Sequence, residues 1–453
     1  MSPTESIVSA ARQRHRADWV LIVAMDCQAL DDSPESLSLV GVSEASIGRG
    51  PARRWAAAGG RARLDLADRW ISQDHARLVR DGDRWAIEDA GSRNGTRVNR
   101  ERVERKTVAD GDVVECGGTT LMLRRVARPG FTGQPLAERP EALRTLNPTL
   151  DHELDVLRKV ARSPIPVLVL GESGTGKEGI AGVVHSLSGR DGPLVAVNCG
   201  ALPANLVESE LFGSRRGAFS GAEDRPGLIR GAERGTLFLD EVAELPLSSQ
   251  AALLRVLQEK QILPLGAPRP IPIDVRVVAA TNRPVDELAE EGQLRRDLYA
   301  RLRGYELRLP PLRDRLEDLG LLTAALVRKH DPGGAPRTLS RAAASALFAH
   351  RWPLNIRELE QSLSAALAIA GAEIDVEHLP ASVREAGSSF PASMSERERL
   401  VATIQRHGGN LSAVARALVT SRSQLYRLLA RHAIQPDELK SSPAQSGAQS
   451  DPD

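Results

Sequence analysis

A glycine-rich turn directly after an apolar run is the segment of this 453-residue chain with the clearest capacity for chemistry. Residues 167–170 read Val-Leu-Val-Leu and lead straight into Gly-Glu-Ser-Gly-Thr-Gly-Lys at 171–177. Small residues let successive backbone N–H groups wrap phosphate oxygens, a following helix N-terminus favours the anion, and Lys177 can reach the terminal phosphates. The pattern predicts a nucleotide-binding loop between a buried strand and a helix. The alternative is a glycine turn without a ligand.

Two carboxylates follow a second apolar run, Thr-Leu-Phe-Leu at 236–239. Beside a bound triphosphate, Asp240 is suited to hold Mg²⁺ and Glu241 to polarise an attacking water. Without the glycine-rich loop, the pair would be interpreted as a helix cap after a core strand. Glu178 stands where most such loops hold magnesium through a serine or threonine hydroxyl.

A third strand pattern, 275–279, leads to Asn282, whose side chain could sense the γ-phosphate. Further along, Arg295, Arg296 and Arg301 lie within one short segment. Arginine suits bidentate phosphate contacts and the stabilisation of transferring charge. A basic, solvated helix face is the alternative interpretation of these arginines.

Residues 145–384 resemble the AAA+ domain of sigma-54-dependent transcription activators, because the run 171–178 matches the nucleotide loop of that family, Glu178 included. The resemblance implies ATP and Mg²⁺ as cofactors and a ring, taken to be a hexamer, in which arginines act on the neighbouring subunit's ATP. It implies catalytic roles for Asp240, Glu241, Asn198, Arg295 and Arg301, with Asp240 as the magnesium ligand. It implies ATP binding by Gly171, Glu172, Ser173, Gly174, Thr175, Gly176, Lys177, Glu178, Asn282 and Arg357.

The run Gly217, Ala218, Phe219, Ser220, Gly221, Ala222 resembles the loop through which that family contacts the sigma factor. The implied partner is sigma-54 RNA polymerase. Ser220 replaces the usual threonine, so the hydroxyl is kept and a methyl group is lost. Outside this context the run would be interpreted as a glycine hairpin.

The N-terminal motifs, at residues 47–50, 71–76, 89–96 and 110–112, come in an order that resembles a forkhead-associated (FHA) domain. The resemblance implies a phosphothreonine-peptide site made by Arg49, Ser72, Arg93 and Asn94. The ligand would be a phosphorylated partner protein or a phosphorylated segment of this chain, produced by a Ser/Thr kinase.

The segment 395–432 carries seven arginines against two glutamates, a net charge of +5 on a chain whose total is +1. Its helix, turn and helix pattern resembles the Fis-type helix-turn-helix, which implies that Arg422, Ser423, Gln424 and Arg427 face enhancer-like DNA. A charged helical bundle that binds proteins is the alternative.

The elements that must position these groups form several domains. We expect an N-terminal all-β FHA sandwich, a central α/β AAA+ P-loop ATPase with a helical lid, and a C-terminal three-helix helix-turn-helix. The arginine- and alanine-rich stretch 51–63 has no period and is expected to be a surface loop, and the chain from 339 to 384 to be helical. The expected boundaries are 18–126 for the FHA domain, 127–140 for a linker, 141–384 for the AAA+ domain, 385–394 for a second linker, 395–437 for the DNA-binding unit and 438–453 for a disordered tail.

Composition narrows the function classes further. Lys and Arg number 60 against 59 Asp and Glu, so a wholly basic coat for nucleic acid is excluded. The three cysteines lie too far apart for a disulfide framework or a cysteine-rich zinc site, which suits a reducing cytosol. The apolar run 19–25 is far shorter than the ~20 residues that span a bilayer, and we interpret it as a strand.

The sequence therefore predicts a cytoplasmic ATPase that activates transcription by opening promoters held closed by sigma-54 polymerase, switched through the FHA domain. Two alternatives come from other classes. One is a phosphopeptide-gated DNA-binding repressor whose ATPase only assembles it, and the other is an AAA+ unfoldase that serves a protease.

Overall fold

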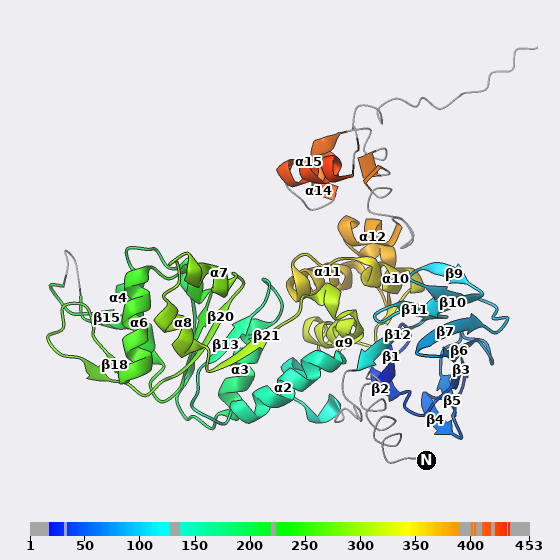
Figure 1. Ribbon diagram of the computed structural model, residues 1–453, viewed down its shortest axis with the longest axis horizontal. Coiled ribbons are helices and arrows are strands. Elements are labelled where there is room, and N and C mark those ends of the chain that lie inside the picture. Colours follow the sequence, from blue (N-terminus) through cyan, green and yellow to red (C-terminus); the bar gives the residue numbers. More distant parts are fainter. Residues whose placement is uncertain are drawn as a thin grey trace, which may run out of the picture.

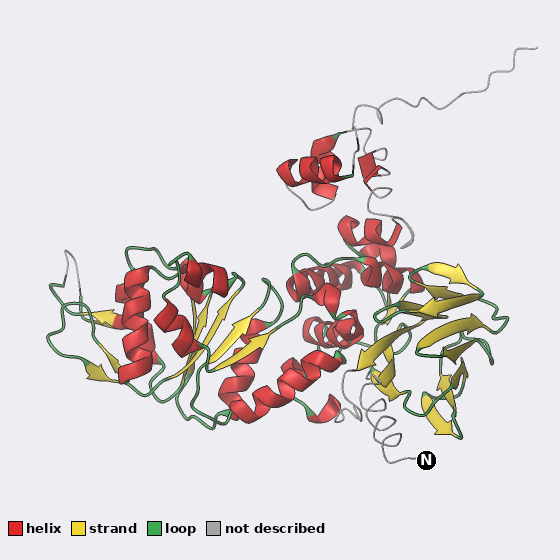
Figure 2. Cartoon of the chain, viewed as in Figure 1, coloured by secondary structure: helices red, strands yellow, loops and turns green. Residues whose placement is uncertain are grey.

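The computed structural model describes residues 18–30, 34–126, 136–218, 223–388 and parts of 400–434. Figure 1 shows a β-sandwich at one end, a sheet-and-helix unit at the other and a group of helices between them. Figure 2 shows the same division by secondary structure. None of the helices in the described segments is long and apolar enough to cross a membrane.

The N-terminal unit is a sandwich of two six-stranded sheets, as predicted. One sheet has the order β2-β1-β12-β11-β8-β9 and the other β10-β7-β6-β3-β5-β4. Inward-facing apolar side chains such as Ile47, Leu64 and Trp85 fill the space between the sheets. The strands are β1 (Asp18–Asp26), β2 (Glu35–Ser38), β3 (Glu44–Arg49), β4 (Arg54–Ala58), β5 (Arg61–Leu66), β6 (Ala76–Asp81), β7 (Arg84–Asp89), β8 (Thr96–Val98), β9 (Glu101–Val103), β10 (Arg105–Val108), β11 (Val113–Cys116) and β12 (Thr119–Val126).

The prediction of a surface loop at 51–63 is wrong. Residues 54–58 form β4, which pairs antiparallel with β5, and Trp55 lies opposite Leu64. β4 is an edge strand, and all of its residues except the half-buried Trp55 are exposed. Since only Trp55 of β4 packs against the core, its sequence carries no alternation of apolar and polar residues from which a strand could be predicted.

The central unit contains a five-stranded parallel sheet in the order β14-β17-β20-β13-β21, as the alternating strand and helix patterns predicted. β20 lies between β17 and β13, so three strand ends that carry polar residues lie next to one another. Its main elements are α2 (Pro148–Val160), β13 (Val167–Leu170), α3 (Lys177–Leu187), β14 (Leu194–Asn198), α4 (Val207–Phe212), α5 (Leu228–Gly231), β17 (Thr236–Asp240), α6 (Leu247–Glu259), β20 (Arg276–Thr281), α7 (Val285–Glu290), α8 (Arg296–Leu302) and β21 (Tyr305–Arg308). Short pieces complete it: η2 (Glu141–Leu143), η3 (Cys199–Ala201), β15 (Gly213–Ser214), β16 (Arg225–Pro226), η4 (Val242–Glu244), β18 (Gln261–Ile262) and β19 (Ile271–Pro272).

A helical lid follows the sheet. Its elements are η5 (Leu312–Asp314), η6 (Leu316–Asp318), α9 (Leu319–His330), α10 (Arg341–Ala349), α11 (Asn355–Ile369), η7 (Val376–His378) and α12 (Ala381–Ser388). The expectation of a purely helical segment from 339 needs one correction, because β22 (Thr338–Leu339) and β23 (Glu373–Ile374) form a short parallel pair.

Each expected linker overlaps a structured segment at one end. The first was placed at 127–140, but η1 (Leu136–Glu138) and the buried Arg139 already pack on the following unit, where Arg139 ion-pairs with Asp151. The second was placed at 385–394, but α12 continues to Ser388. Long-range packing of this kind leaves no local signal in a segment rich in proline or glycine.

The C-terminal unit is helical where it is described. α14 (Leu411–Ala417) and α15 (Arg422–Arg431) pack through Val414, Leu425 and Leu429. The predicted turn at 419–420 and the tail from 438 lie outside the described residues.

A core substitution tests the sandwich. Leu64 on β5 is fully buried, so Leu64→Ala should lose about 2–5 kcal/mol of stability and lower the temperature of the sandwich transition in calorimetry of the full chain. Val40→Ala, at a position 57% exposed, is the control and should leave that transition within about 1 °C. Equal shifts for the two variants would show that β5 does not line the core.

Candidate functional site

The glycine-rich loop lies at the carboxyl end of β13 and leads into α3, as predicted. Gly174 and Gly176 adopt φ of 78° and 103°, conformations that favour glycine. Lys177 is only 7% exposed, and its ammonium group donates hydrogen bonds to the carbonyls of Gly171 (3.0 Å) and Glu172 (3.4 Å). A cation is thus held against the loop backbone where anionic phosphates would need it.

The two predicted carboxylates lie at the carboxyl end of β17, two strands from the strand that carries the loop. Glu241 lies with one oxygen 3.5 Å from the Lys177 ammonium, and its other oxygen accepts hydrogen bonds from the Asn282 backbone N–H (3.1 Å) and the Thr281 hydroxyl (3.4 Å). Glu241 itself has φ of 54°, a strained backbone conformation of the kind found at functional sites. The structure therefore brings together Lys177, Glu241 and the end of β20 that carries Asn282.

Asp240 is suited to hold a divalent cation. Burial raises the pKa of its carboxyl group, Lys177 opposes that rise, and the nearby Glu241 and Glu178 carboxylates reinforce it. A bound cation would relieve this electrostatic penalty. Mg²⁺ is commonly bound by one or two carboxylates together with nucleotide phosphates, and Asp240 could supply one such carboxylate.

The lid closes over the loop from α11. Arg357 donates a hydrogen bond to the Ser173 hydroxyl (2.7 Å), and the Ile356 N–H donates to the Gly174 carbonyl (2.9 Å). A Cβ on Gly174 would lie 2.3 Å from the Leu354 carbonyl oxygen, so only glycine permits this approach. Leu354 stands where the related family commonly has glycine, but its φ is −103°, so leucine fits there without strain.

Three lid residues at this site were missed by sequence reasoning. Asn355 donates to the Ser173 carbonyl (3.0 Å) and the Glu172 carboxylate (3.2 Å). Arg313 makes a bidentate pair with Glu172 and holds the pKa of that carboxyl below its usual value. Arg315 is buried and donates to the Thr175 carbonyl (2.8 Å). No local pattern marks Arg313 or Arg315, since their contacts join residues far apart in sequence, whereas Asn355 lies two residues before the predicted Arg357.

Three predicted catalytic residues lie apart from this group. The Asn198 side chain accepts hydrogen bonds from the Gly200 and Ala201 N–H groups rather than contacting Glu241. Arg295 pairs with Asp297, and Arg301 donates to the Leu257 carbonyl (3.4 Å). Both arginines are exposed, and neither hydrogen-bonds to the nucleotide loop of its own chain.

The predicted sigma-contact loop rises from two adjoining hairpins. β15 pairs with β16, and Ser214 of β15 bridges to Leu265 in the β18–β19 connection. The Ala218 N–H donates to the Arg215 carbonyl, which secures the start of the loop. Gly217 and Ala218 are described, whereas Phe219, Ser220, Gly221 and Ala222 lie outside the described residues.

In the sandwich, the predicted phosphopeptide residues come from three neighbouring loops. The Arg49 N–H donates to the Ser72 carbonyl (2.9 Å), and the Arg93 N–H donates to the Ser72 hydroxyl (3.1 Å). The Asn94 side-chain amide donates to the Trp70 carbonyl (2.7 Å). The Arg49 and Arg93 side chains are exposed, so two cations are available beside a hydroxyl group, as a phosphate dianion requires.

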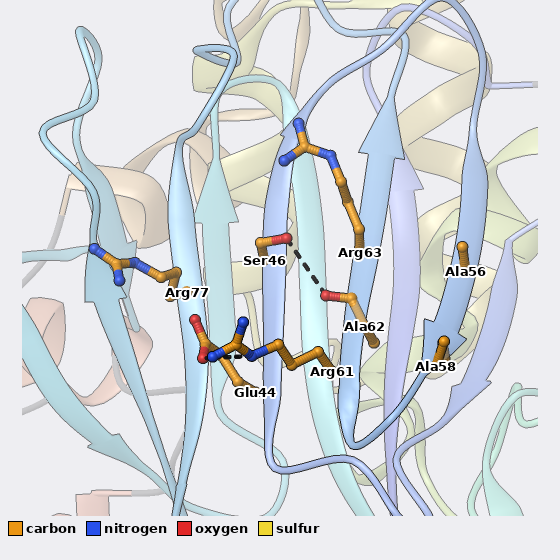
Figure 3. Close-up of a pocket in the computed structure, with 9 residues that line it drawn as sticks. Glu44, Ser46, Ala56, Ala58, Arg61, Ala62, Arg63 and Arg77 are labelled. Atoms are coloured by element: carbon orange, nitrogen blue, oxygen red, sulfur yellow. Dashed lines mark hydrogen bonds and ion pairs between the residues drawn. The ribbon is translucent and has the colours of Figure 1, made fainter.

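A shallow groove of about 650 Å³ lies on the outer face of the second sheet of the sandwich (Figure 3). Arg61, Arg63 and Arg77 line it, and Arg61 lies 3.9 Å from the Glu44 carboxylate. None of the four predicted phosphopeptide residues lines this groove, so it is separate from the predicted phosphopeptide site.

On α15, the predicted inward residue Leu425 is buried, while Arg427 is exposed beside Tyr426. The side chains of Arg422, Ser423 and Gln424 lie outside the described residues.

Four protein-family models match this chain in the same order as its structural units. They are the FHA domain (residues 45–117), the sigma-54 interaction domain (143–308), the AAA+ ATPase lid domain (313–396) and the Fis family of bacterial regulatory proteins (392–432). The chain is thus a multidomain AAA+ protein with an FHA domain and a DNA-binding helix-turn-helix.

Several known proteins and solved structures are similar to this chain. The chain is 36% identical over 449 residues to the acetoin catabolism regulatory protein of Cupriavidus necator, covering 93% of this chain and 65% of that protein. It is 39% identical to the transcriptional regulatory protein GlrR of Escherichia coli, covering 66% of this chain and 70% of that protein. The crystal structure of NtrX from Brucella abortus in complex with ADP matches with a TM-score of 0.50 and 29% identity, covering 64% of this chain and 70% of that one. The chain belongs to the family of sigma-54-dependent transcriptional regulators.

A substitution at the closest approach of lid and loop tests the site. Gly174→Ala would place a methyl group against the Leu354 carbonyl and strain the backbone, so nucleotide affinity should fall roughly tenfold. Titration of the full chain with a fluorescent ADP analogue measures this. Gly182→Ala on α3, where a Cβ meets nothing within 4 Å, is the control. Unchanged affinity in Gly174→Ala would show that the lid does not close on the loop.

Proposed function

We propose that the chain hydrolyses ATP to remodel the closed promoter complex of sigma-54 RNA polymerase, under the control of a phosphothreonine ligand on its FHA domain. One observation carries the proposal. At one edge of the parallel sheet, the Glu241 carboxylate contacts both the Lys177 ammonium and the backbone N–H of Asn282, which follows β20. Family membership supports the partner, because the segment 143–308 matches the sigma-54 interaction domain.

Each residue has a distinct role in the proposed hydrolysis. Lys177 and the backbone N–H groups of the loop bind the phosphates, and Asp240 holds Mg²⁺. Glu241 orients and polarises the attacking water, with its carboxylate held in place by the Asn282 N–H. The metal, when bound, neutralises charge on the phosphate oxygens.

The proposed enzyme acts as a ring, with a hexamer as the expected size. Arg295 and Arg301 are exposed and make no hydrogen bond to the loop of their own chain, which supports their acting on ATP bound by a neighbouring subunit. By the family resemblance, Asn198 would restrain Glu241. Its side chain now caps residues 200–201, so this role requires a rearrangement.

The proposed output passes through the loop 217–222, which would press Phe219 on the sigma factor. The C-terminal helix α15 would hold the ring on an enhancer-like site, with Arg427 exposed for contact with DNA. The chain spans 65% of the length of the Cupriavidus necator relative, and the activity proposed here concerns the domains present.

An isosteric change at the proposed water-polarising residue tests hydrolysis. Glu241→Gln keeps the shape but removes the base, so the ATPase rate constant should fall at least ~100-fold while nucleotide and DNA binding persist. Glu244→Gln, an exposed position three residues away, is the control and should keep the rate within about twofold. Comparable rates for Glu241→Gln and the unmodified protein would remove Glu241 from the mechanism.

The phosphothreonine site has its own test. A phosphothreonine peptide library should be retained by the full chain, whereas the same library with unmodified threonine should not. Arg49→Ala removes an exposed cation beside Ser72 and should reduce retention at least ~10-fold, while Arg84→Ala, exposed at a distant hairpin, should not. Equal retention of both libraries would contradict phosphothreonine recognition.

A further inference from the structure

The first strand of the FHA sandwich is apolar on both faces. Leu21 and Val23 pack in the sandwich core, whereas Val20 and Ile22 belong to a second cluster that contains α9 and α10 of the lid. Met122, directly opposite Ile22 on β12, belongs to the same cluster. Without the lid, the sandwich would expose this apolar face to water. The lid therefore buries it.

The two domains also meet through their backbones. A Cβ on Gly320, at the start of α9, would lie 1.9 Å from the Ala24 carbonyl oxygen of β1, so only glycine fits. The Leu339 N–H donates a hydrogen bond to the Cys27 carbonyl (2.8 Å). These contacts fix the FHA domain against the lid rather than leaving it tethered by a linker.

The segment between β21 and α9, residues 309–318, is called the hinge here. It contacts the nucleotide loop on one side and the FHA domain on the other. On the loop side, Arg315 donates to the Thr175 carbonyl (2.8 Å). On the FHA side, Arg124 of β12 lies 3.1 Å from the Glu317 carboxylate, which also accepts a hydrogen bond from Asn147 (2.8 Å). Residues 315–318 therefore connect the two.

The Glu317 carboxylate is fully buried, and Arg124 is its ion-pair partner among the described residues. Burial and the neighbouring Asp318 raise the pKa of Glu317 to about 7, and Arg124 opposes that rise. Removing one partner from a buried ion pair is strongly destabilising, because the remaining charge has no compensation. Without Arg124, Glu317 would have to take up a proton or move toward water, and either change would alter the contacts of the hinge.

We propose that Arg124 of the FHA domain is a positioning residue for the nucleotide loop, fixing the hinge through Glu317 so that Arg315 holds Thr175. The inference rests on the proposed ATPase activity. It adds a way in which the FHA domain could control nucleotide binding. The phosphopeptide loops adjoin the same interface, since Asn94 donates to the Trp70 carbonyl and the Trp70 ring packs against the lid cluster, 5.9 Å from the Arg341 guanidinium. A ligand at these loops would act on the lid through Trp70.

A double-mutant cycle in the full chain tests the proposal. Arg124→Gln should raise the dissociation constant of a fluorescent ADP analogue and the KM for ATP roughly tenfold, with kcat changed less than about twofold. Glu317→Gln removes the buried charge that needs a partner. The double variant, Arg124→Gln with Glu317→Gln, should therefore have the same dissociation constant for the ADP analogue as Glu317→Gln alone. Arg125→Gln, exposed on the next position of β12, is the matched control.

The outcomes separate this inference from the proposed function. If Arg124→Gln and Arg125→Gln bind nucleotide equally well, or if the two substitutions at Arg124 and Glu317 have additive effects, the positioning role is wrong while the ATPase stands. If the unmodified chain binds no nucleotide, the proposed function itself fails. Retention of the phosphothreonine library by Arg124→Gln shows that the sandwich remains folded, so that a loss of nucleotide binding reports on the hinge.

Discussion

The nucleotide site depends on one largely buried ion pair, between Lys177 at the start of α3 and Glu241 at the end of β17. Burying opposite charges is tolerated only where hydrogen bonds compensate the lost water, and here the loop carbonyls and the Asn282 N–H supply them. The parallel sheet brings these groups to one edge because β20 lies between β13 and β17. In the proposed mechanism, Lys177 binds the phosphates and Glu241 polarises the attacking water.

The lid links this site to the rest of the chain. Its hinge and α11 contact the glycine-rich loop, and its α9 covers the outer face of β1. A change in the position of the lid would therefore alter the contacts of both the bound nucleotide and the FHA domain. Such coupling between two binding sites is reciprocal in binding free energy. The same interface explains why β1 is a continuous apolar run and not an alternating one.

Sequence reasoning predicted the fold class and the family, and the structure and the family matches confirm both. The loop and the carboxylates were found because each is a local strand-to-turn pattern. Arg313 and Arg315 were missed because their partners lie about 140 residues away, and the edge strand β4 because four of its five residues are exposed. The strand at 19–25 was predicted correctly, but nothing local indicated that a lid would cover its outer face. The roles of the individual site residues remain predictions.

Promoter opening is the most direct test of the central claim, which is that nucleotide hydrolysis by this chain drives remodelling of a sigma-54 polymerase complex. Permanganate reactivity of a promoter bound by sigma-54 RNA polymerase, followed together with phosphate release, reports both events in one reaction. The account predicts open-complex formation with ATP and none with a non-hydrolysable analogue. Phosphate release without opening, or opening that proceeds equally well with the analogue, would contradict it.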